Sequence, residues 1–532
     1  MDIKKQEAGI QQYLMLIASL TVFLAVTIIL AYKTQFKSPG DYLNYYYGST
    51  FLFQGISTES IYDPASFNKY IATEGIEHAF SNYTPVPPFS LLFYYPFTLI
   101  EFSLSKLIFN ILSLCIFIFS LYRLCIELAV KPWIICTVLF VLIYPIYNNL
   151  VQGQSYLLII ALLIEGYLFS LRGKVWFSAL FFAIPITLKL FPAILMLWLF
   201  FAGRKKEFFL TIIFTGVLSF SVIPFMGIDS WLKYHISILP RLISGEINDP
   251  FSVTYQSYAV LLKKVFVYDK MLNPFPVVHA LWLMYVFTTI ISAVCIHACI
   301  QFLQNNNRQL FLCFGMVFLC GLTVSGYGTN YSLVLLLFIA IACLSSDVYS
   351  GFYKVCLLIL ICITAFFQSV WFSNFPVELQ FGRLYSILII FFLLIKGQRI
   401  VWFSKTFFFL LLLLLIPIVL KYVQKKDHTD YYLTHEPSLF ITSYDIVPEG
   451  IHLSYIGKEG SGTVVYKTKD HISISDQLYI KNNQVYEGTK QITFGKDLKK
   501  QPAYLNTREI IYLSDYGRGP GLTTLRKLKL HE

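Results

Sequence analysis

Long apolar segments alternate with short polar turns through about the first four-fifths of the chain. Most of them approach the roughly 20 apolar residues that an α-helix needs to cross a membrane. Lipid offers no hydrogen-bond partners, so within a bilayer only helices and closed barrels satisfy their backbone polar groups. Because these segments are continuous, the pattern predicts helices. We expect a polytopic membrane protein with about 12 to 14 transmembrane helices, near residues 13–32, 89–103, 105–128, 133–149, 155–171, 175–203, 207–227, 276–302, 309–325, 330–346, 354–372, 382–396 and 405–422.

Polar stretches divide the chain into regions. Two long ones, at 33–88 and 228–275, lie between apolar segments and are predicted to be large loops. From about residue 423, β-branched residues alternate with polar ones, which is typical of half-buried strands. We therefore expect a transmembrane domain over 1–422 and a small soluble all-β domain over 423–532. Its last strands resemble the blade motif of TolB-like propellers, but the length fits only a truncated propeller-like sheet or a small sandwich.

Composition and charge support a membrane protein and orient it. The chain is 56% hydrophobic and only 13% charged, whereas soluble proteins carry about a quarter charged residues. Lys4 and Lys5 precede the first helix, so the positive-inside rule places the N-terminus in the cytoplasm and both loops and the β domain outside. The net charge of +11 is not gathered in a basic soluble domain, so we expect membrane lipids as partners and no nucleic acid.

Asp41 stands alone where the first predicted helix ends. It follows the turn pair Pro39-Gly40 and precedes a tyrosine-rich run that contains Tyr45 and Tyr46. Pro and Gly stop a helix, so the carboxylate lies at the membrane–water boundary, where an acid is a functional candidate. Alternatively, Asp41 only caps the next helix, since Asp is favoured at helix starts. That helix, about 43–53, is predicted to be amphipathic and to lie on the membrane.

Other polar residues carry similar alternatives. Asp63 precedes a proline and is either a turn residue or functional. Lys189 interrupts the apolar segment 175–203, which is either a broken helix or a hairpin. The side chain of Lys189 either extends to the membrane–water interface or pairs with a phosphate. Arg241, in the second long loop, is either solvated or an anion contact. No tight acidic cluster is present, so we expect no cofactor and leave a divalent cation open.

Several short motifs, taken in order, carry a family resemblance. The chain resembles the GT-C glycosyltransferases of glycosyltransferase family 87, which includes polyprenyl-phosphate-mannose-dependent mannosyltransferases of bacteria. The resemblance covers about residues 10–420 and differs at Tyr156, where the family commonly has Asn. It differs also at 325–331, where Asn330 stands in place of a His. The motifs are Asp41 with Tyr45 and Tyr46, Gly55, Ile61-Tyr62-Asp63-Pro64, Tyr83-x-Pro85, Gly153-Gln154-Ser155-Tyr156, Arg172-Gly173-Lys174 and Lys189-Leu190-Phe191-Pro192.

The resemblance implies a hexosyltransferase of the bacterial plasma membrane that uses a polyprenyl-phosphate sugar. Asp41 would be the general base for an acceptor hydroxyl on a lipid-linked molecule or glycan. By analogy, attack inverts the anomeric carbon, and one carboxylate suffices because a lipid phosphate leaves readily. The remaining candidates for donor or acceptor binding are Lys189, Gln154, Tyr45, Tyr46, Asp63, Tyr83, Asn330 and Arg241.

Two other classes of multi-helical membrane protein remain open at this stage. A flippase or transporter for lipid-linked sugars often contains internal repeats, and none is evident here. An oligosaccharide polymerase or ligase would place basic residues in a large later loop, and 228–275 contains some.

Overall fold

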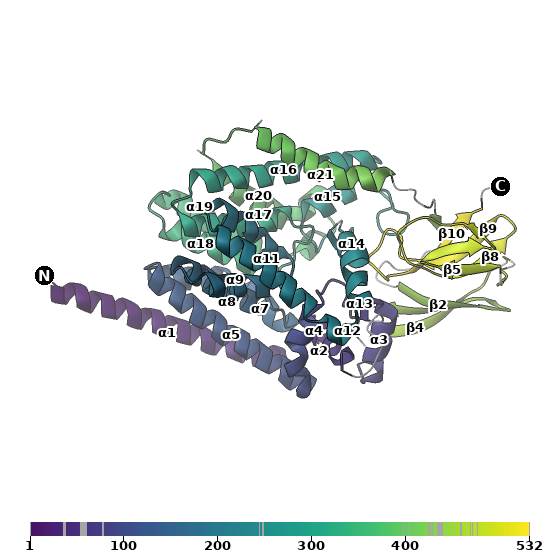
Figure 1. The fold of residues 1–532 in the computed structure, drawn as a ribbon, viewed down its shortest axis with the longest axis horizontal. Coiled ribbons are helices and arrows are strands. Elements are labelled where there is room, and N and C mark those ends of the chain that lie inside the picture. The colour runs from purple at the N-terminus through teal and green to yellow at the C-terminus, as the bar shows by residue number, and fades with distance from the viewer. Residues whose placement is uncertain are drawn as a thin grey trace.

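A helical body and a C-terminal β domain lie side by side in the structure, which is a computed structural model (Figure 1). Helix α1 (Asp2–Thr34) begins at the end of the molecule farthest from the strands. Gly55 of the first predicted loop is outside the described part of the chain. The structure describes residues 2–35, 39–53, 61–76, 79–243, 245–246, 249–396, 398–402, 404–423, 427, 429–433, 440–457, 460–468, 470, 472–475 and 477–530.

The helical body forms one large apolar core, with a second core, rich in tyrosine and other aromatic residues, at the end that faces the strands. The longer helices after α1 are α5 (Phe102–Glu127), α6 (Pro132–Val141), α7 (Ile143–Gln152), α8 (Tyr156–Leu171), α9 (Val175–Leu188), α11 (Lys205–Phe220), α16 (Leu281–Asn305), α17 (Leu310–Val324), α18 (Leu336–Ser345), α19 (Gly351–Phe366), α20 (Gly382–Ile395) and α21 (Lys405–Val423).

Shorter elements, several of which contribute residues to the second core, connect these helices. They are α2 (Tyr42–Phe51), α3 (Pro64–Thr73), α4 (Phe89–Tyr94), η2 (Tyr95–Leu99), η3 (Phe191–Ile194), α10 (Leu195–Phe201), α12 (Ile223–Met226), α13 (Ile228–Leu232), the π-helix η4 (Lys233–Ile238), α14 (Leu239–Ile243), α15 (Tyr258–Phe266), η5 (Tyr331–Leu335), η6 (Ser369–Phe372) and η7 (Val377–Phe381).

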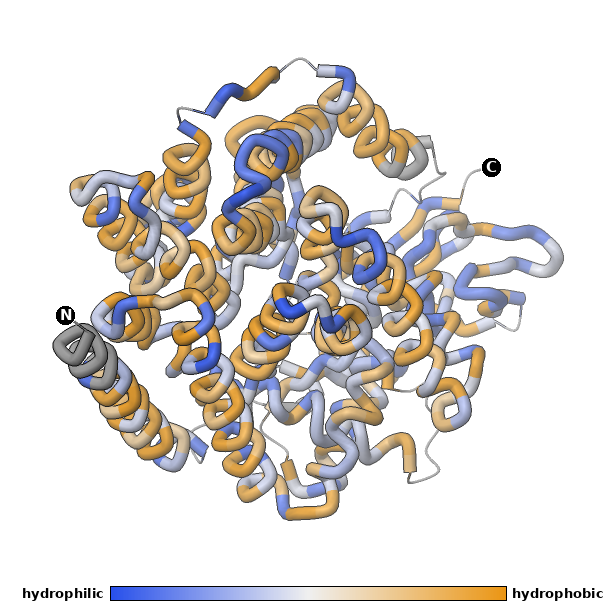
Figure 2. The backbone as a smooth tube through the Cα atoms, turned by 60° about the vertical axis from the view of Figure 1, so that its left-hand side comes forward, coloured by the Kyte–Doolittle hydropathy of each residue, from blue (hydrophilic) through white to orange (hydrophobic). Residues whose placement is uncertain are grey.

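The lengths and hydropathy of the helices fit a multi-pass membrane protein. Among the described residues, five helices are long and apolar enough to cross a membrane, and the bent pair α6 and α7 makes up to six. Eight shorter apolar helices accompany them. Hydrophobic residues predominate along the helices, while hydrophilic ones are frequent at helix ends and in the strands (Figure 2). The predicted class, a polytopic helical protein with a small C-terminal β domain, is confirmed.

The segment 175–203, left open from the sequence, is interrupted at Lys189. Helix α9 ends at Leu188, Lys189 is extended, and the chain resumes as η3 and α10. Pro192 lies at the start of η3, and in a continuous helix it could not donate to the carbonyl of Leu188, four residues earlier, and its ring would clash with that carbonyl. The break therefore places a lysine at an irregular point between two apolar helices.

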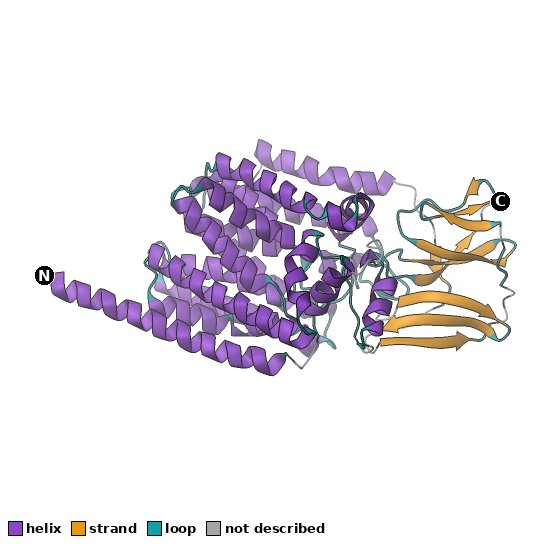
Figure 3. Ribbon diagram, turned by 60° about the horizontal axis from the view of Figure 1, so that its bottom comes forward, coloured by secondary structure: helices purple, strands orange, loops and turns teal. Residues whose placement is uncertain are grey.

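The described residues of the β domain form three antiparallel sheets (Figure 3). Alternate residues of β9 point to opposite faces, as strand geometry requires. Ile511 and Leu513 pack toward the sheet β2-β3-β4, and Ile510 and Tyr512 pack toward the sheet β5-β6-β7. The strands are β1 (Thr429–Tyr431), β2 (Phe440–Val447), β3 (Gly450–Gly457), β4 (Gly460–Tyr466), β5 (Leu478–Lys481), β6 (Gln484–Glu487), β7 (Lys490–Gln491), β8 (Lys499–Asn506), β9 (Glu509–Ser514) and β10 (Thr524–Lys529).

The β domain docks on the helical body through ion pairs. Arg241 contacts Asp515 at 2.9 Å and Glu246 at 2.7 Å, and Asp515 is fully buried. Burial raises the pKa of Asp515, whereas the charge of Arg241 and its hydrogen bond oppose this shift. A second pair joins Lys500 to Asp63 at 3.1 Å. The interface between the β domain and the helical body therefore contains specific ion pairs, and each of the two long loops contributes one of them.

We expect Arg241→Met to destabilise the protein by about 3–5 kcal/mol, because it leaves the buried Asp515 without its cation. The measurement is thermal unfolding of the purified protein in detergent. Lys270→Met is the matched control, since its pair with Asp430 is exposed and is worth at most about 1 kcal/mol. Equal melting temperatures for the two variants would show that the Arg241 pair does not hold the domain.

Candidate active site

Two glycine turns bring Asp41 and Gln154 together from distant parts of the sequence. Gly40 and Gly153 have φ of +63° and +62°, a region that favours glycine. A Cβ on Gly40 would lie 2.7 Å from Cα of Gln152, and one on Gly153 would lie 2.5 Å from Cβ of Tyr42. The turns therefore pack directly on each other, and side chains at either glycine would separate them.

Asp41 occupies the backbone position of a helix cap but does not use its side chain as one. It precedes α2, and its carboxylate makes no capping hydrogen bond. Instead, Oδ2 accepts a hydrogen bond from Nε2 of Gln154. The half-buried carboxylate is thus directed away from its own helix and toward the turn after α7.

Lys189 joins the same cluster from the break after α9. Its Nζ donates to Oε1 of Gln154 at 2.9 Å. The ammonium also lies 5.5 Å from the ring centroid of Tyr45 and 5.3 Å from that of Tyr156, within cation–π range. Two aromatic rings and an amide therefore hold the cation at the irregular point of the chain.

Lys106, which was not among the residues singled out from the sequence, also interacts with Asp41. Lys106 is fully buried in α5, and its Nζ donates to the carbonyl oxygen of Val151 at 2.7 Å. Its charge interacts with the carboxylate of Asp41, as does that of Lys189. A lysine within an apolar helix is the signal that drew attention to Lys189, and it applied equally here.

The predicted tyrosines form a buried aromatic core around the cluster. The ring of Tyr45 stacks on that of Tyr94 at 4.5 Å, and its hydroxyl donates to Oε1 of Gln154 at 2.9 Å. The hydroxyl of Tyr46 donates to the carbonyl oxygen of Ile100 at 2.8 Å. Tyr83 packs against Gly48, where a Cβ would overlap its ring.

The helix predicted to lie on the membrane is present as α2 but is placed differently. Its residues are buried on nearly all sides within the protein. The expectation of an amphipathic surface helix is therefore wrong, because the tyrosines pack against α4, η2 and α5.

Two of the remaining candidates lie away from the cluster, and a third, Asn330, lies next to a residue that borders it. Asp63 and Arg241 bind the β domain through the ion pairs described above. Asn330 directly precedes Tyr331, whose ring is 5.4 Å from that of Tyr156. Its buried Oδ1 has no hydrogen-bond partner within the described residues. The structure thus brings together Asp41, Tyr45, Gln154 and Lys189, and places Asn330 beside them.

Among the described residues, no group of three or more His, Cys, Asp or Glu side chains could hold a metal ion. The charges of the cluster come instead from one carboxylate and two lysines. Such a set can accept a proton and bind an anion without a metal ligand sphere.

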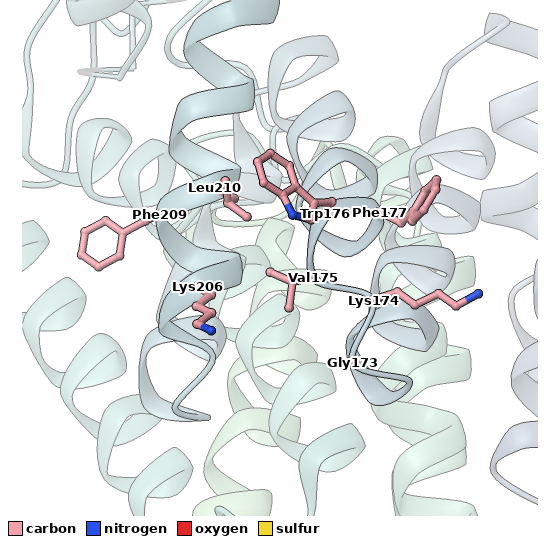
Figure 4. A pocket seen from close by; sticks show the side chains of 8 residues that line it. All are labelled: Gly173, Lys174, Val175, Trp176, Phe177, Lys206, Phe209 and Leu210. Atoms are coloured by element: carbon pink, nitrogen blue, oxygen red, sulfur yellow. The ribbon is translucent and has the colours of Figure 1, made fainter.

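A cavity of about 770 Å³ lies at the other end of α9 (Figure 4). It is lined by residues on either side of the starts of α9 and α11, including Lys174, Trp176, Lys206 and Phe209. Helix α9 has 14 residues, so its two ends are about 21 Å apart. The cavity is therefore separate from the cluster around Lys189.

Comparison with known proteins gives one match. Residues 83–326 match the model of glycosyltransferase family 87, a span that contains Gln154 and Lys189 but not Asp41. No curated protein and no solved structure matches the chain. The predicted resemblance is confirmed over these residues, where the chain is similar to a family of membrane glycosyltransferases.

Proposed function

We propose that the protein transfers a hexose from a polyprenyl-phosphate sugar to a hydroxyl group of a lipid-linked or glycan acceptor. Asp41 is the general base, and Lys189 binds the donor phosphate. The observation that carries this proposal is the shared contact of both side chains with one amide, that of Gln154.

The two oxygens of Asp41 differ in a way that suits a base. Oδ2 accepts a hydrogen bond from Gln154. Within the described residues, Oδ1 has no such donor, so it is free to take the proton of an acceptor hydroxyl. A carboxylate within hydrogen-bond reach of the attacking hydroxyl accelerates such a step about 10²- to 10⁴-fold.

The reaction is a single displacement. The acceptor oxygen forms a bond to the anomeric carbon as its proton passes to Asp41. The bond from that carbon to the phosphate oxygen breaks, and its electron pair leaves with the phosphate. Lys189 stabilises the charge that remains on the lipid phosphate. Attack from the face opposite the phosphate inverts the anomeric carbon, so a β-linked donor gives an α-linked product.

Position and family support a lipid donor on the outer side of a bacterial plasma membrane. Asp41 follows the end of a membrane-spanning helix, and Lys189 lies between two apolar helices. An amphiphilic phosphate can therefore reach the cation from within the bilayer. By resemblance to family 87, we propose mannose as the transferred sugar.

The test is sugar transfer in proteoliposomes with synthetic polyprenyl-phosphate mannose. We expect transfer from this donor and none from a nucleotide sugar in the absence of lipid. A second arm with polyprenyl-phosphate glucose tests the choice of sugar. Transfer from a soluble nucleotide sugar alone would overturn the donor assignment, since no lipid phosphate would then be required.

A further inference from the structure

Gln154 lies at the centre of the cluster and contacts three side chains from two other segments, the start of α2 and the break after α9. Its Nε2 donates to Oδ2 of Asp41. Its Oε1 accepts from the hydroxyl of Tyr45 and from Nζ of Lys189, both at 2.9 Å. Only 3% of Gln154 is exposed, so water does not compete for these bonds. All three contacts therefore act on a single rigid amide.

The chemistry of its neighbours permits one orientation of this amide. A lysine ammonium has only donors, and an ionised carboxylate has only acceptors. Rotating the amide by 180° would direct its NH₂ group at Lys189 and its oxygen at Asp41. Both contacts would then be repulsive. The orientation in the structure is thus required by the charges on either side of it.

The neutral amide also keeps the acid and the cation apart. Within the described part of the chain, Asp41 and Lys189 form no direct ion pair, although each interacts with the charge of the other through the cluster. A direct pair would neutralise both groups and occupy the oxygen and the ammonium that the substrates need. Gln154 holds both side chains in place. It leaves Oδ1 of Asp41 and the other N–H groups of Lys189 available to the substrates.

We propose that Gln154 is a positioning residue for the transfer, which fixes the carboxylate of Asp41 and prevents its collapse onto Lys189. This inference rests on the proposed function. It assigns Gln154 a role different from the donor or acceptor binding predicted from the sequence. It also explains why the turn at Gly153 must pack against Tyr42, since that packing sets the distance from the amide to the acid.

The test is the pH profile of kcat/KM for Gln154→Glu. A carboxylate at this position can still accept from Tyr45 and Lys189, but it faces Asp41 with a like charge. Two carboxylates that share a site do not ionise together, so the acidic limb should move upward by at least about one pH unit. The groups that interact electrostatically with Asp41 are Tyr45, Lys106, Tyr156, Lys189, Tyr255 and Tyr331.

A second variant, Gln154→Asn, keeps the amide but shortens its reach by one methylene. It cannot bridge Asp41 and Lys189 at the same time, so we expect kcat to fall roughly tenfold or more. The matched control is Gln380→Glu, because Gln380 is buried and donates to the backbone oxygens of Ser373 and Phe375. The acidic limb of the pH profile of Gln380→Glu should coincide with that of the wild type.

The outcomes separate this inference from the proposed function. If the wild type transfers sugar from the lipid donor but Gln154→Glu loses activity equally at every pH, the positioning role is overturned and the function stands. If Gln154→Glu fails to fold in detergent, an unchanged kcat in Gln154→Asn overturns the role instead. Absence of transfer by the wild type from any lipid donor overturns the proposed function itself.

Discussion

Asp41→Asn is expected to lower kcat about 10²- to 10⁴-fold, with little change in KM for the donor. Asparagine has nearly the same size, and its side-chain oxygen can still accept a hydrogen bond from Nε2 of Gln154. The cluster therefore keeps its geometry and loses only the group that takes the proton. The measurement is steady-state transfer from polyprenyl-phosphate mannose in proteoliposomes.

Glu101→Gln is the control for this prediction. Glu101 caps a helix with its side chain, which Asp41 does not. Its carboxylate accepts hydrogen bonds from the backbone amides of Ser103 and Leu104 at the start of α5. Its substitution should cost about 1 kcal/mol of stability and leave kcat within about twofold. If Asp41→Asn keeps the wild-type kcat, Asp41 is not the general base, whatever kcat the Glu101→Gln control shows.

The sequence contained enough information to select the members of the cluster one at a time. Asp41 follows a helix-stopping turn, Lys189 interrupts an apolar segment, and Gln154 belongs to a short motif of the family. Each is unusual in its local context, because polar groups near the bilayer need a partner. Local context, however, does not say which partner each one has.

The contacts between these residues depend on packing that a single sequence does not reveal. Asp41 and Gln154 are 113 residues apart, and they meet only because the turns at Gly40 and Gly153 pack on each other. From the sequence, Gly40 belongs to a turn pair and Gly153 to a short motif of the family, and neither pattern indicates the contact between them. Their conformation and their mutual contact are properties of the assembled fold.

The charged residues of the long loops show the same limit. Asp63 and Arg241 were candidates because each is a charge in a large loop beside the membrane domain. In the structure they pair with Lys500 and Asp515, which belong to the β domain. The sequence predicted this domain, but a partner more than 270 residues away cannot be found from local patterns.

The β domain consequently bears on the site without supplying residues to the cluster. Its ion pairs hold α3 and α14, and both helices border the aromatic core that surrounds Tyr45. A shift of that core would move Tyr45 relative to Gln154. The domain therefore stabilises the segment that positions Asp41, the proposed base, and we expect loss of docking to lower activity through a shift of this core.

Lys189→Met is expected to lower kcat/KM for the lipid donor about tenfold to a hundredfold, mainly through a higher KM. A hydrogen bond to a charged group contributes about 1.5–3 kcal/mol, and 1.4 kcal/mol corresponds to a tenfold change. Methionine fills the space of the lysine stem between the rings of Tyr45 and Tyr156, so the aromatic packing is kept. The variant should also lose inhibition by polyprenyl phosphate that carries no sugar.

Lys174→Met provides the matched control, because Lys174 precedes the same helix at its opposite end. It contacts the ring of Phe169 and lines the separate cavity, about 21 Å from the cluster by the length of α9. We expect its KM and its inhibition by polyprenyl phosphate to match those of the wild type. If the two variants behave alike, the lysines act on the membrane surface in general, and Lys189 does not bind the donor phosphate. If only Lys189→Met loses inhibition, the phosphate lies beside the amide of Gln154 and therefore within the cluster that contains the base.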